Sequence, residues 1–430
     1  MIGCVKSVES LYFNPSGAAS QTLNLTKGQV VENCVPFVTY QSSSSSTDAA
    51  RWRIDVYFPN STQIKIERTA ASDNTAGHIY IVEFDPNKVR VQQGSFTCLD
   101  EAVAPQNTVV ALAQTVDTSK AAVVAHYRTA LTTGDWDGHS LQFGLSSSNF
   151  SAYRYQGDDT ALYGHYYVFE SLTGNFTVQQ KQLAFTGSDT LKSDTITAVN
   201  GNKSFVVSSV YTTNNSSSWF YSTFDAKLVG GSSVEAQRAV AGAYTTIKFF
   251  IIEFHDDTTV RHGDVSLSSS DLQDDNTITE VDTNYAAAIN TTAMGTMRVS
   301  TTSSQDGLCD HYLTSSTNVR ALRNAAAVAA EGRYQVVEFS QAPGYYFGGT
   351  VSERAIPSDP LTPVVTTVRA YRRDTGDFMG EATSSGIGGS YYLETTYSGS
   401  HYVVALDPSG GESYNILGYD LVVPTTISGG

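Results

Sequence analysis

One short pattern of hydrophobic and polar positions occurs four times along the chain. It is an apolar stretch that ends on a glutamate beside an aromatic residue: "HIYIVEFDP" (78–86), "HYYVFESL" (165–172), "FFIIEFHD" (249–256) and "YQVVEFSQ" (334–341). In the first copy, Tyr80, Val82 and Phe84 would point to one face of a strand, and Ile79 and Ile81 to the other. Since both faces are apolar, the pattern predicts a central strand that is buried on both sides.

The glutamates of this pattern recur with a nearly constant period. Glu83, Glu170, Glu253 and Glu338 are separated by 87, 83 and 85 residues. A second ladder lies upstream, with separations of 86, 84 and 85 residues, and consists of Arg68, Arg154, Arg238 and Arg323. Two ladders in register over four copies indicate an internal repeat. A repeat of about 85 residues suits a small β-sandwich.

Each arginine precedes its glutamate by 15 or 16 residues. That spacing fits an antiparallel hairpin, with a loop such as "ASDNTAG" (71–77) between two strands. It predicts four ion pairs at the rims of the sandwiches: Arg68 with Glu83, Arg154 with Glu170, Arg238 with Glu253 and Arg323 with Glu338. The alternative is that both charges are solvated at strand ends. An exposed pair would contribute little to stability, whereas a half-buried pair would fix strand register. Neither arrangement is catalytic.

A polar turn followed by an apolar strand is a third repeated feature. It reads "TVDTSKAAVVA" (115–125), "AVNGNKSFVVS" (198–208) and "EVDTNYAAAIN" (280–290), and the first repeat has "LTKGQVVENCVPFVTYQ" (25–41) in its place. The predicted fold is therefore all-β, with four tandem β-sandwich repeats and a small C-terminal Ig-like or transthyretin-like sandwich. The predicted boundaries are 1–99, 100–186, 187–268 and 269–352 for the repeats, 353–363 for a proline-rich linker and 364–430 for the C-terminal sandwich.

Composition agrees with an all-β fold. Aromatic residues make up 11% of the chain and charged residues 16%, and the aromatic share suits pleated, half-buried surfaces. One segment, "NVRALRNAAAVAAEG" (318–332), is rich in helix formers. This segment could form a short helix, but the preserved spacing of the arginine and glutamate ladders favours a strand and a loop. The net charge of −16 would repel phosphate backbones, so no nucleic-acid partner is expected.

The cysteines and the apolar runs bear on the cellular compartment. Cys4, Cys34, Cys98 and Cys309 form no CxxC pair, so free thiols in a reducing compartment are expected. Cys34 with Cys98 is the one pairing worth testing, because both lie in the predicted first repeat. The N-terminus lacks the apolar run of a signal peptide, and "FFII" (249–252) is far short of the roughly 20 residues of a membrane span. We therefore expect synthesis in the cytoplasm and no membrane insertion. Work outside a cell would then require lysis or assembly into a particle.

No catalytic constellation emerges from the sequence. "DWDGH" (135–139) is predicted to be a polar turn, because a calcium loop needs more ligands. "EFHDD" (253–257) lacks a third metal ligand at a defined spacing, and no P-loop, G-x-S-x-G or H-E-x-x-H motif is present. We therefore expect no enzyme activity, no catalytic or metal-binding residue and no cofactor. The tyrosine-rich segments 153–167 and 344–349 suit strand packing, and also a protein interface or sugar stacking.

The C-terminal segment carries a specific resemblance. Its motifs are "VRAYRRDTGDFMGEATSS" (368–385), "GSYYLE" (389–394), "HYVVALD" (401–407) and "YNILGYDLVVP" (414–424). They resemble the carboxypeptidase-regulatory-like, or transthyretin-like, module found at the ends of structural proteins of tailed bacteriophages. The repeats also resemble phage virion proteins whose β-units share "VDTSKA", a central arginine and "VVEF…VQRG". The matching segments here are 116–121, 336–339 and 91–94.

The resemblance implies a non-enzymatic structural protein of a tailed-phage virion. The expected location is a tail or fibre-like appendage, with a role in assembly and host attachment. Sandwiches joined in line would form a rod with the C-terminal module at its end. The expected partners are other virion proteins, further copies of the chain, and a host-surface glycan or protein as receptor. The alternatives are a capsid decoration or head-fibre protein, and a bacterial surface adhesin, against which the missing export signal counts.

Overall fold

The fold is almost entirely β. The computed structural model describes residues 3–43, 51–71, 75–99, 106–129, 140–155, 161–213, 223–291, 297–300, 304–342, 345–353, 360–395, 397, 399–406 and 417–426. These residues form many short antiparallel sheets, and the helical elements among them are three-residue 3-10 turns. The predicted all-β class is confirmed. The chain divides into two compact units, residues 3–340 and 341–430.

The first unit contains four repeats of one six-stranded design. In repeat 1 the strands β1 (Val5–Phe13), β6 (Thr75–Phe84) and β3 (Cys34–Ser42) form an antiparallel sheet in that order. The strands β2 (Ser20–Asn24), β5 (Gln63–Glu67) and β4 (Asp55–Asn60) form a second sheet. We call the sheet of the first, sixth and third strands the inner sheet, and the other the outer sheet.

Repeats 2, 3 and 4 keep both strand orders. Repeat 2 consists of β7 (Val89–Cys98), β8 (Gln106–Ala111), β9 (Ala121–Thr129), β10 (Gln142–Leu145), β11 (Asn149–Arg154) and β12 (Leu162–Ser171). Repeat 3 consists of β13 (Phe176–Phe185), β14 (Leu191–Thr195), β15 (Ser204–Thr212), β16 (Asp225–Val229), β17 (Ser233–Gln237) and β18 (Thr245–Phe254). Repeat 4 consists of β19 (Thr259–Leu267), β20 (Gln273–Thr277), β21 (Ala286–Asn290), β22 (Asp310–Ser315), β23 (Asn318–Leu322) and β24 (Ala330–Glu338).

The four alternating stretches form the sixth strands β6, β12, β18 and β24, each at the centre of its inner sheet. Repeat 3 shows how both faces are buried. Ile247, Phe249 and Ile251 pack in a core made by repeat 3 itself. Phe250 and Ile252, on the opposite face, belong to a larger core shared with the other repeats. The central-strand prediction is confirmed, and the second face is covered by a neighbouring repeat.

The boundaries differ from those predicted. Strand β7 pairs with β12 over its whole length, so it opens repeat 2, whereas the predicted boundary at residue 99 assigned it to repeat 1. The same correction applies to β13 and β19, and the repeats span 5–84, 89–171, 176–254 and 259–338. The prediction failed because the first strand follows the preceding repeat after a short turn, and no marker residue assigns it to either side. Strand β25 (Tyr345–Thr350) likewise pairs with β30 (Ser390–Thr395) in the C-terminal unit.

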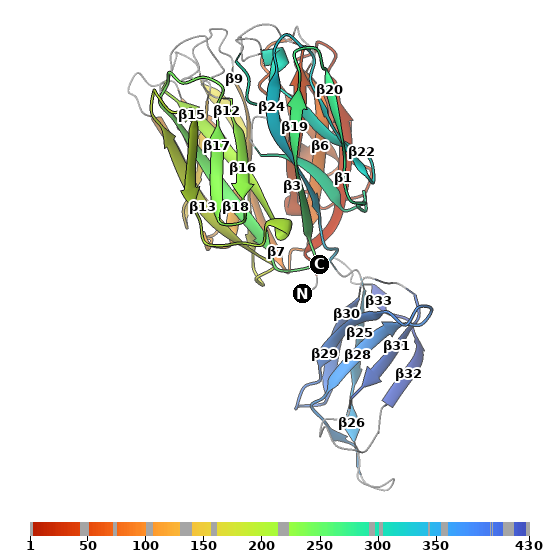
Figure 1. The fold of residues 1–430 in the computed structure, drawn as a ribbon. Coiled ribbons are helices and arrows are strands. Elements are labelled where there is room, and N and C mark those ends of the chain that lie inside the picture. Colours follow the sequence, from red (N-terminus) through yellow and green to blue (C-terminus); the bar gives the residue numbers. More distant parts are fainter. Residues whose placement is uncertain are drawn as a thin grey trace. The chain divides into compact units, whose positions relative to one another are not determined.

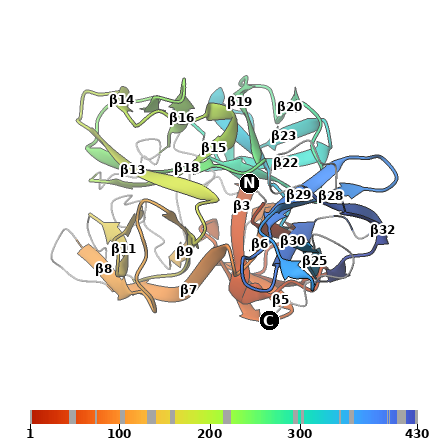
Figure 2. The ribbon, with the colours of Figure 1, turned by 90° about the horizontal axis from the view of Figure 1, so that it is seen from below.

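The four repeats form a closed ring rather than a row (Figures 1 and 2). Strand β4 contacts β12 of the next repeat, β10 contacts β18, β16 contacts β24, and β22 of repeat 4 contacts β6 of repeat 1. The last contact uses the same pair of strands as the other three, so the ring closes with an approximate fourfold symmetry. The expected rod is therefore wrong, because repeat 4 packs back on repeat 1.

The ring is tied together by side chains that cross between repeats. Leu313 N donates to Tyr80 Oη over 3.1 Å from repeat 4 to repeat 1, and Tyr167 Oη donates to Val56 O over 3.0 Å from repeat 2 to repeat 1. The amide side chain of Gln335 bonds both the N–H and the carbonyl of Val206, each over 2.8 Å, and so occupies the free edge of β15. Buried polar groups of one repeat thus find their partners in another, as burial requires.

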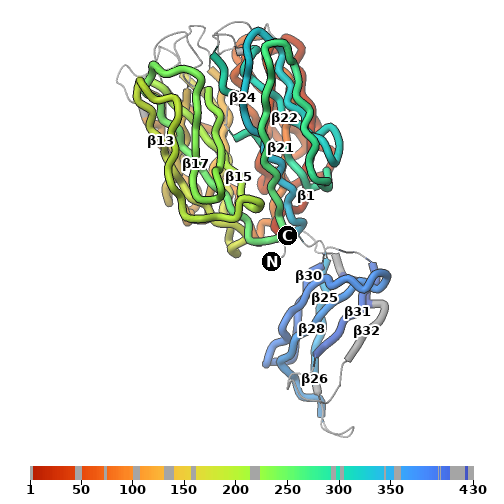
Figure 3. The backbone as a smooth tube through the Cα atoms, in the orientation of Figure 1, coloured from red at the N-terminus to blue at the C-terminus, as the bar shows by residue number. Residues whose placement is uncertain are grey.

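The C-terminal unit is a separate small sandwich (Figure 3). One sheet has the order β30-β25-β33, a second has the order β29-β28-β31-β32, and a third consists of two short strands. The remaining strands are β26 (Ser352–Glu353), β27 (Thr362–Pro363), β28 (Thr367–Arg372), β29 (Phe378–Thr383), β31 (His401–Ala405), β32 (Leu417–Val422) and β33 (Thr425–Thr426). Its core contains Phe347, Val368, Leu393 and Val403. Since Phe347 contributes to this core, the sandwich begins well before the predicted residue 364.

Removing the C-terminal unit should leave the ring folded. A chain that ends at Ser340 keeps all four repeats, and we expect its ring to melt at an unchanged midpoint by circular dichroism. A chain that ends at Asp257 lacks repeat 4, so the second face of β6 loses its cover, and we expect loss of cooperative melting. An equally cooperative transition in the shorter chain would show that the ring does not need closure.

Candidate functional site

The arginine ladder lies inside the repeats. The four side chains are at most 3% exposed, and they donate to backbone carbonyls of the loops around them. In repeat 3, Arg238 donates through Nε to Asp189 O over 2.8 Å, through Nη2 to Thr186 O over 2.8 Å and through Nη1 to Ala243 O over 2.9 Å. One guanidinium therefore joins the loop after β13 to the loop before β18.

The other arginines play the same part. Arg68 donates to Ala18 O and Arg51 O, over 3.0 and 2.8 Å. Arg323 donates to Asp271 O over 2.9 Å and to Val328 O over 2.6 Å. A guanidinium has five N–H donors and no acceptor, so it can satisfy several buried carbonyls that no regular strand pairs. The loops at this end of each repeat depend on it.

The glutamate ladder holds the polar turns. A carboxylate oxygen accepts the backbone N–H at the start of the turn in every repeat: Val30 N to Glu83 (3.2 Å), Asp117 N to Glu170 (2.7 Å), Asn200 N to Glu253 (2.7 Å) and Asp282 N to Glu338 (2.7 Å). Two of these glutamates also pair with an arginine on the first strand, namely Arg90 with Glu170 and Arg261 with Glu338. The repeated turn and the repeated glutamate are thus one structural feature.

The predicted pairing of each ladder arginine with the glutamate of its own repeat is wrong. Arg68 follows β5 in the outer sheet, whereas Glu83 lies on β6 in the inner sheet. Arg68 Nη1 lies 3.3 Å from Thr75 Oγ1, at the start of β6, and Glu83 lies eight residues further, roughly 26 Å along the strand. The 15-residue spacing reflects a crossover between sheets, not a hairpin. The two ladders stabilise opposite ends of each repeat.

A third set of charged side chains, which was not among the predicted residues, joins the repeats to one another. The same position of the sixth strand, on the face that meets the preceding repeat, carries a basic residue in all four repeats: His78, His165, Lys248 and Arg333. A signal was present, because each of these residues lies five positions before its ladder glutamate. The chemistry varies between histidine, lysine and arginine, which hides the pattern.

An acidic residue at the start of the fourth strand of the preceding repeat meets this basic residue at three junctions. His165 Nδ1 lies 2.8 Å from Asp55 Oδ2, and His78 Nδ1 lies 2.8 Å from Asp310 Oδ2. Arg333 Nε lies 3.4 Å from Asp225 Oδ1. Burial raises the pKa of Asp55 and Asp225, and the facing basic side chains partly offset this rise. Buried charges need such partners, so the pairs fix how neighbouring repeats dock.

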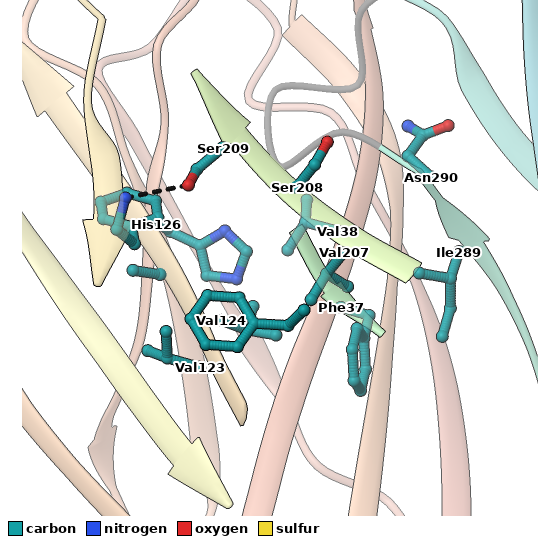
Figure 4. Close-up of a pocket in the computed structure, with 13 residues that line it drawn as sticks. Phe37, Val38, Val123, Val124, His126, Val207, Ser208, Ser209, Ile289 and Asn290 are labelled. Carbon is teal, nitrogen blue, oxygen red and sulfur yellow. Dashed lines mark hydrogen bonds between the residues drawn. The ribbon is translucent and has the colours of Figure 1, made fainter. Parts of the chain in front are cut away.

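A small cavity lies where the four repeats meet (Figure 4). The third strands of all repeats line it, with Phe37 from β3, His126 from β9, Ser208 from β15 and Ile289 from β21. Its volume of about 30 Å³ holds about one water molecule, which is too small for an organic substrate. His126 Nε2 lies 3.0 Å from Pro36 O, and burial lowers the pKa of His126 to about 4.

The described residues hold no group of three or more metal-ligating side chains. From the segment 253–257, His255 Nε2 lies 3.2 Å from Thr177 Oγ1, and Asp256 accepts the N–H of Thr258 over 2.9 Å. Both side chains are thus engaged locally. The segment 135–139 lies outside the described residues.

All four cysteines are buried free thiols, and burial raises the pKa of Cys34 and Cys98.

The tyrosine-rich segments mostly pack within the sheets. Tyr166 stacks on Phe150 with ring centroids 4.5 Å apart, and Tyr167 is buried. In the C-terminal unit, Tyr346 stacks on Tyr392 with centroids 4.9 Å apart. No helix in the described part of the chain has the length and apolar character to cross a bilayer.

The chain matches no protein-family profile and no curated protein. Among solved structures it is similar to the T6 backbone pilin of serotype M6 Streptococcus pyogenes, described as a modular three-domain structure decorated with variable loops and extensions. The identity is 10%, the match covers 96% of this chain and 81% of the pilin chain, and the TM-score is 0.19. So low a score establishes neither a shared fold nor a shared role.

Replacing Arg238 by methionine should destabilise the ring by about 3 kcal/mol, because several buried carbonyls lose their donor. Urea unfolding followed by circular dichroism measures the change. The matched control is Arg320→Met, which removes a partly exposed pair with Asp275 and should cost less than about 1 kcal/mol. Equal effects of the two substitutions would contradict a structural role for the buried ladder.

His311 should make the ring sensitive to acid. Burial lowers the pKa of His311 to about 3, and neither ring nitrogen has a hydrogen-bond partner among the described residues. Below pH 6.5 the unfolded chain binds the proton more readily, so stability that is complete above pH 6.5 is lost as the pH falls towards 3. At pH 5 the loss amounts to about 2 kcal/mol. His311→Val, which takes the residue found at Val56 in repeat 1, should unfold with a shallower pH dependence between 6.5 and 4. If His311→Val and the wild-type chain lost stability equally between pH 6.5 and 4, His311 would not be the cause of the acid sensitivity.

Proposed function

We propose that the chain is a non-enzymatic structural protein, in which the ring is a rigid scaffold and the C-terminal sandwich is an attachment module. One observation carries this proposal. The repeated charged side chains hold loops, turns and junctions in place. Arg238 donates to backbone carbonyls, Glu253 accepts from the N–H of Asn200, and Asp310 contacts His78 and Thr39. The cavity at the centre of the ring is of water size. Repeated residues that serve the fold point to a scaffold.

The finer proposal is a component of a tailed-phage virion, made in the host cytoplasm and contributing to assembly and host attachment. Its support is the resemblance of the motifs at 368–385 and 401–407 to the terminal module of phage structural proteins. Within that class, the closed ring favours a compact knob or capsid decoration over the shaft of a fibre, because ring closure adds no length along an axis. Its partners would be other virion proteins, copies of the chain and a receptor on the host surface.

Immunogold labelling of particles from the source culture tests this function. Antibody against the recombinant chain should label virions, at the tail tip for an attachment knob or over the head for a decoration protein. A chain that ends at Ser340, supplied with particles that lack the native protein, should fold but fail to restore the label. Label confined to bacterial surfaces, with none on particles, would overturn the virion proposal and favour an adhesin.

A further inference from the structure

The junction between repeats 2 and 3 lacks the acid found at the other three. The basic residue there is Lys248, and the position of the facing aspartate holds Gln142. The side-chain amide of Gln142 donates to Thr246 O over 3.3 Å. Lys248 is half-buried, yet its amine forms no ion pair or hydrogen bond with any described residue. The centroid of the Phe250 ring lies 5.8 Å from this amine.

The same junction also lacks the side chain that covers the basic residue elsewhere. Tyr57 stacks on His165 and Tyr312 stacks on His78, each with centroids 4.3 Å apart. The equivalent residue facing Lys248 is Gly144, two positions after Gln142. The amine is therefore uncovered on the side where two of the other junctions have an aromatic ring.

Because Gly144 has no side chain, the hydroxyl of Ser151 on the neighbouring strand lies close to the amine of Lys248. A Cβ atom added to Gly144 would lie 3.6 Å from Lys248 Nζ and 2.4 Å from Ser151 Oγ. The amine and the hydroxyl therefore lie at most about 6 Å apart, because their separation cannot exceed the sum of these two distances. Lysine offers three donors and serine one. These donors suit a small acceptor group with a negative charge.

We infer that Lys248 and Ser151 form a binding site for a carboxylate. At the other three junctions the equivalent basic residue pairs with an aspartate, and here Gln142 stands in the place of that aspartate, so the protein supplies the base without the acid. A partly buried ammonium without a counter-charge is costly, so a carboxylate that entered would restore the pairing seen elsewhere. The ligand is either a small free carboxylate or an aspartate or glutamate side chain of a second protein.

Desolvation supports this inference. Burial of the amine in the junction lowers the pKa of Lys248. By contrast, Lys227 at the next junction pairs with Glu235 over 2.7 Å. Carboxylate binding would therefore raise the pKa of Lys248. The inference rests on the unequal junctions of the ring and is independent of the proposed virion role.

Carbon-13 dimethylation of the lysines in the full chain, followed by NMR, tests the site. Lys248→Met identifies the signal of Lys248. Acetate should shift this signal saturably and raise the pKa of the amine, and so should a peptide of six aspartates. Sodium chloride at equal ionic strength should not. Ser151→Ala should weaken acetate binding by roughly tenfold, the cost of one hydrogen bond to a charged group.

Gln142→Asp is the decisive variant, because it supplies the missing acid from the protein itself. We expect its Lys248 signal to be shifted before any addition and to show no response to acetate or to the aspartate peptide. A response to acetate assigns the site to free carboxylates, and a response to the peptide alone assigns it to a protein side chain. No saturable response to either probe in the wild-type chain overturns the inference, and so does an undiminished response in Gln142→Asp. If that variant fails to fold, the thermal midpoint decides: acetate should raise it in the wild-type chain and not in Lys248→Met.

Discussion

The structure depends on one constraint: each inner sheet has two apolar faces, and its own outer sheet covers only one of them. The second face, with Phe250 and Ile252 in repeat 3, must be covered by another repeat, because buried apolar area is the main source of folding free energy. In a row of repeats the first inner sheet would stay bare. Contact between β22 and β6 removes that bare face, so closure follows from the same pattern that makes each central strand apolar on both sides.

The charged residues follow from this arrangement. The junctions between repeats bury Asp55, Asp225 and Asp310, so these carboxylates need partners from outside their own repeat. The arginine and glutamate ladders act within a repeat, at opposite ends of it, whereas the third set acts between repeats. Asp310 accepts from the N–H of His78 and from Thr39 Oγ1, so one carboxylate fixes two strands of repeat 1 against repeat 4. Burial of the apolar faces drives neighbouring repeats together, and the buried charged pairs determine how their strands align.

The sequence was sufficient for the fold class, the number of repeats and the four central strands, because period-2 alternation and an 85-residue period are local signals. Segment 318–332 also follows its register, as β23, a loop and the start of β24, against its helix-forming composition. Closure was not predictable from the period, which is the same in a row and in a ring. The pairing of Arg68 with Glu83 failed because one spacing fits both a hairpin and a crossover between sheets. The junction aspartates could have been predicted from the sequence, because Asp55, Asp225 and Asp310 each lie 13 positions before a ladder arginine.

The unequal junctions indicate where this fold can vary. All four share the geometry of a sixth strand on a fourth strand, yet they contain histidine with aspartate, arginine with aspartate, or lysine with glutamine. If charge pairing alone held the ring, the junction with Gln142 would be its weak point. The apolar contacts around Phe143, Phe250 and Val207 continue through that junction, so the ring tolerates the missing acid. A position that the fold does not need for closure is free to acquire a ligand, and this separates the residues that build the scaffold from those that can give it a partner.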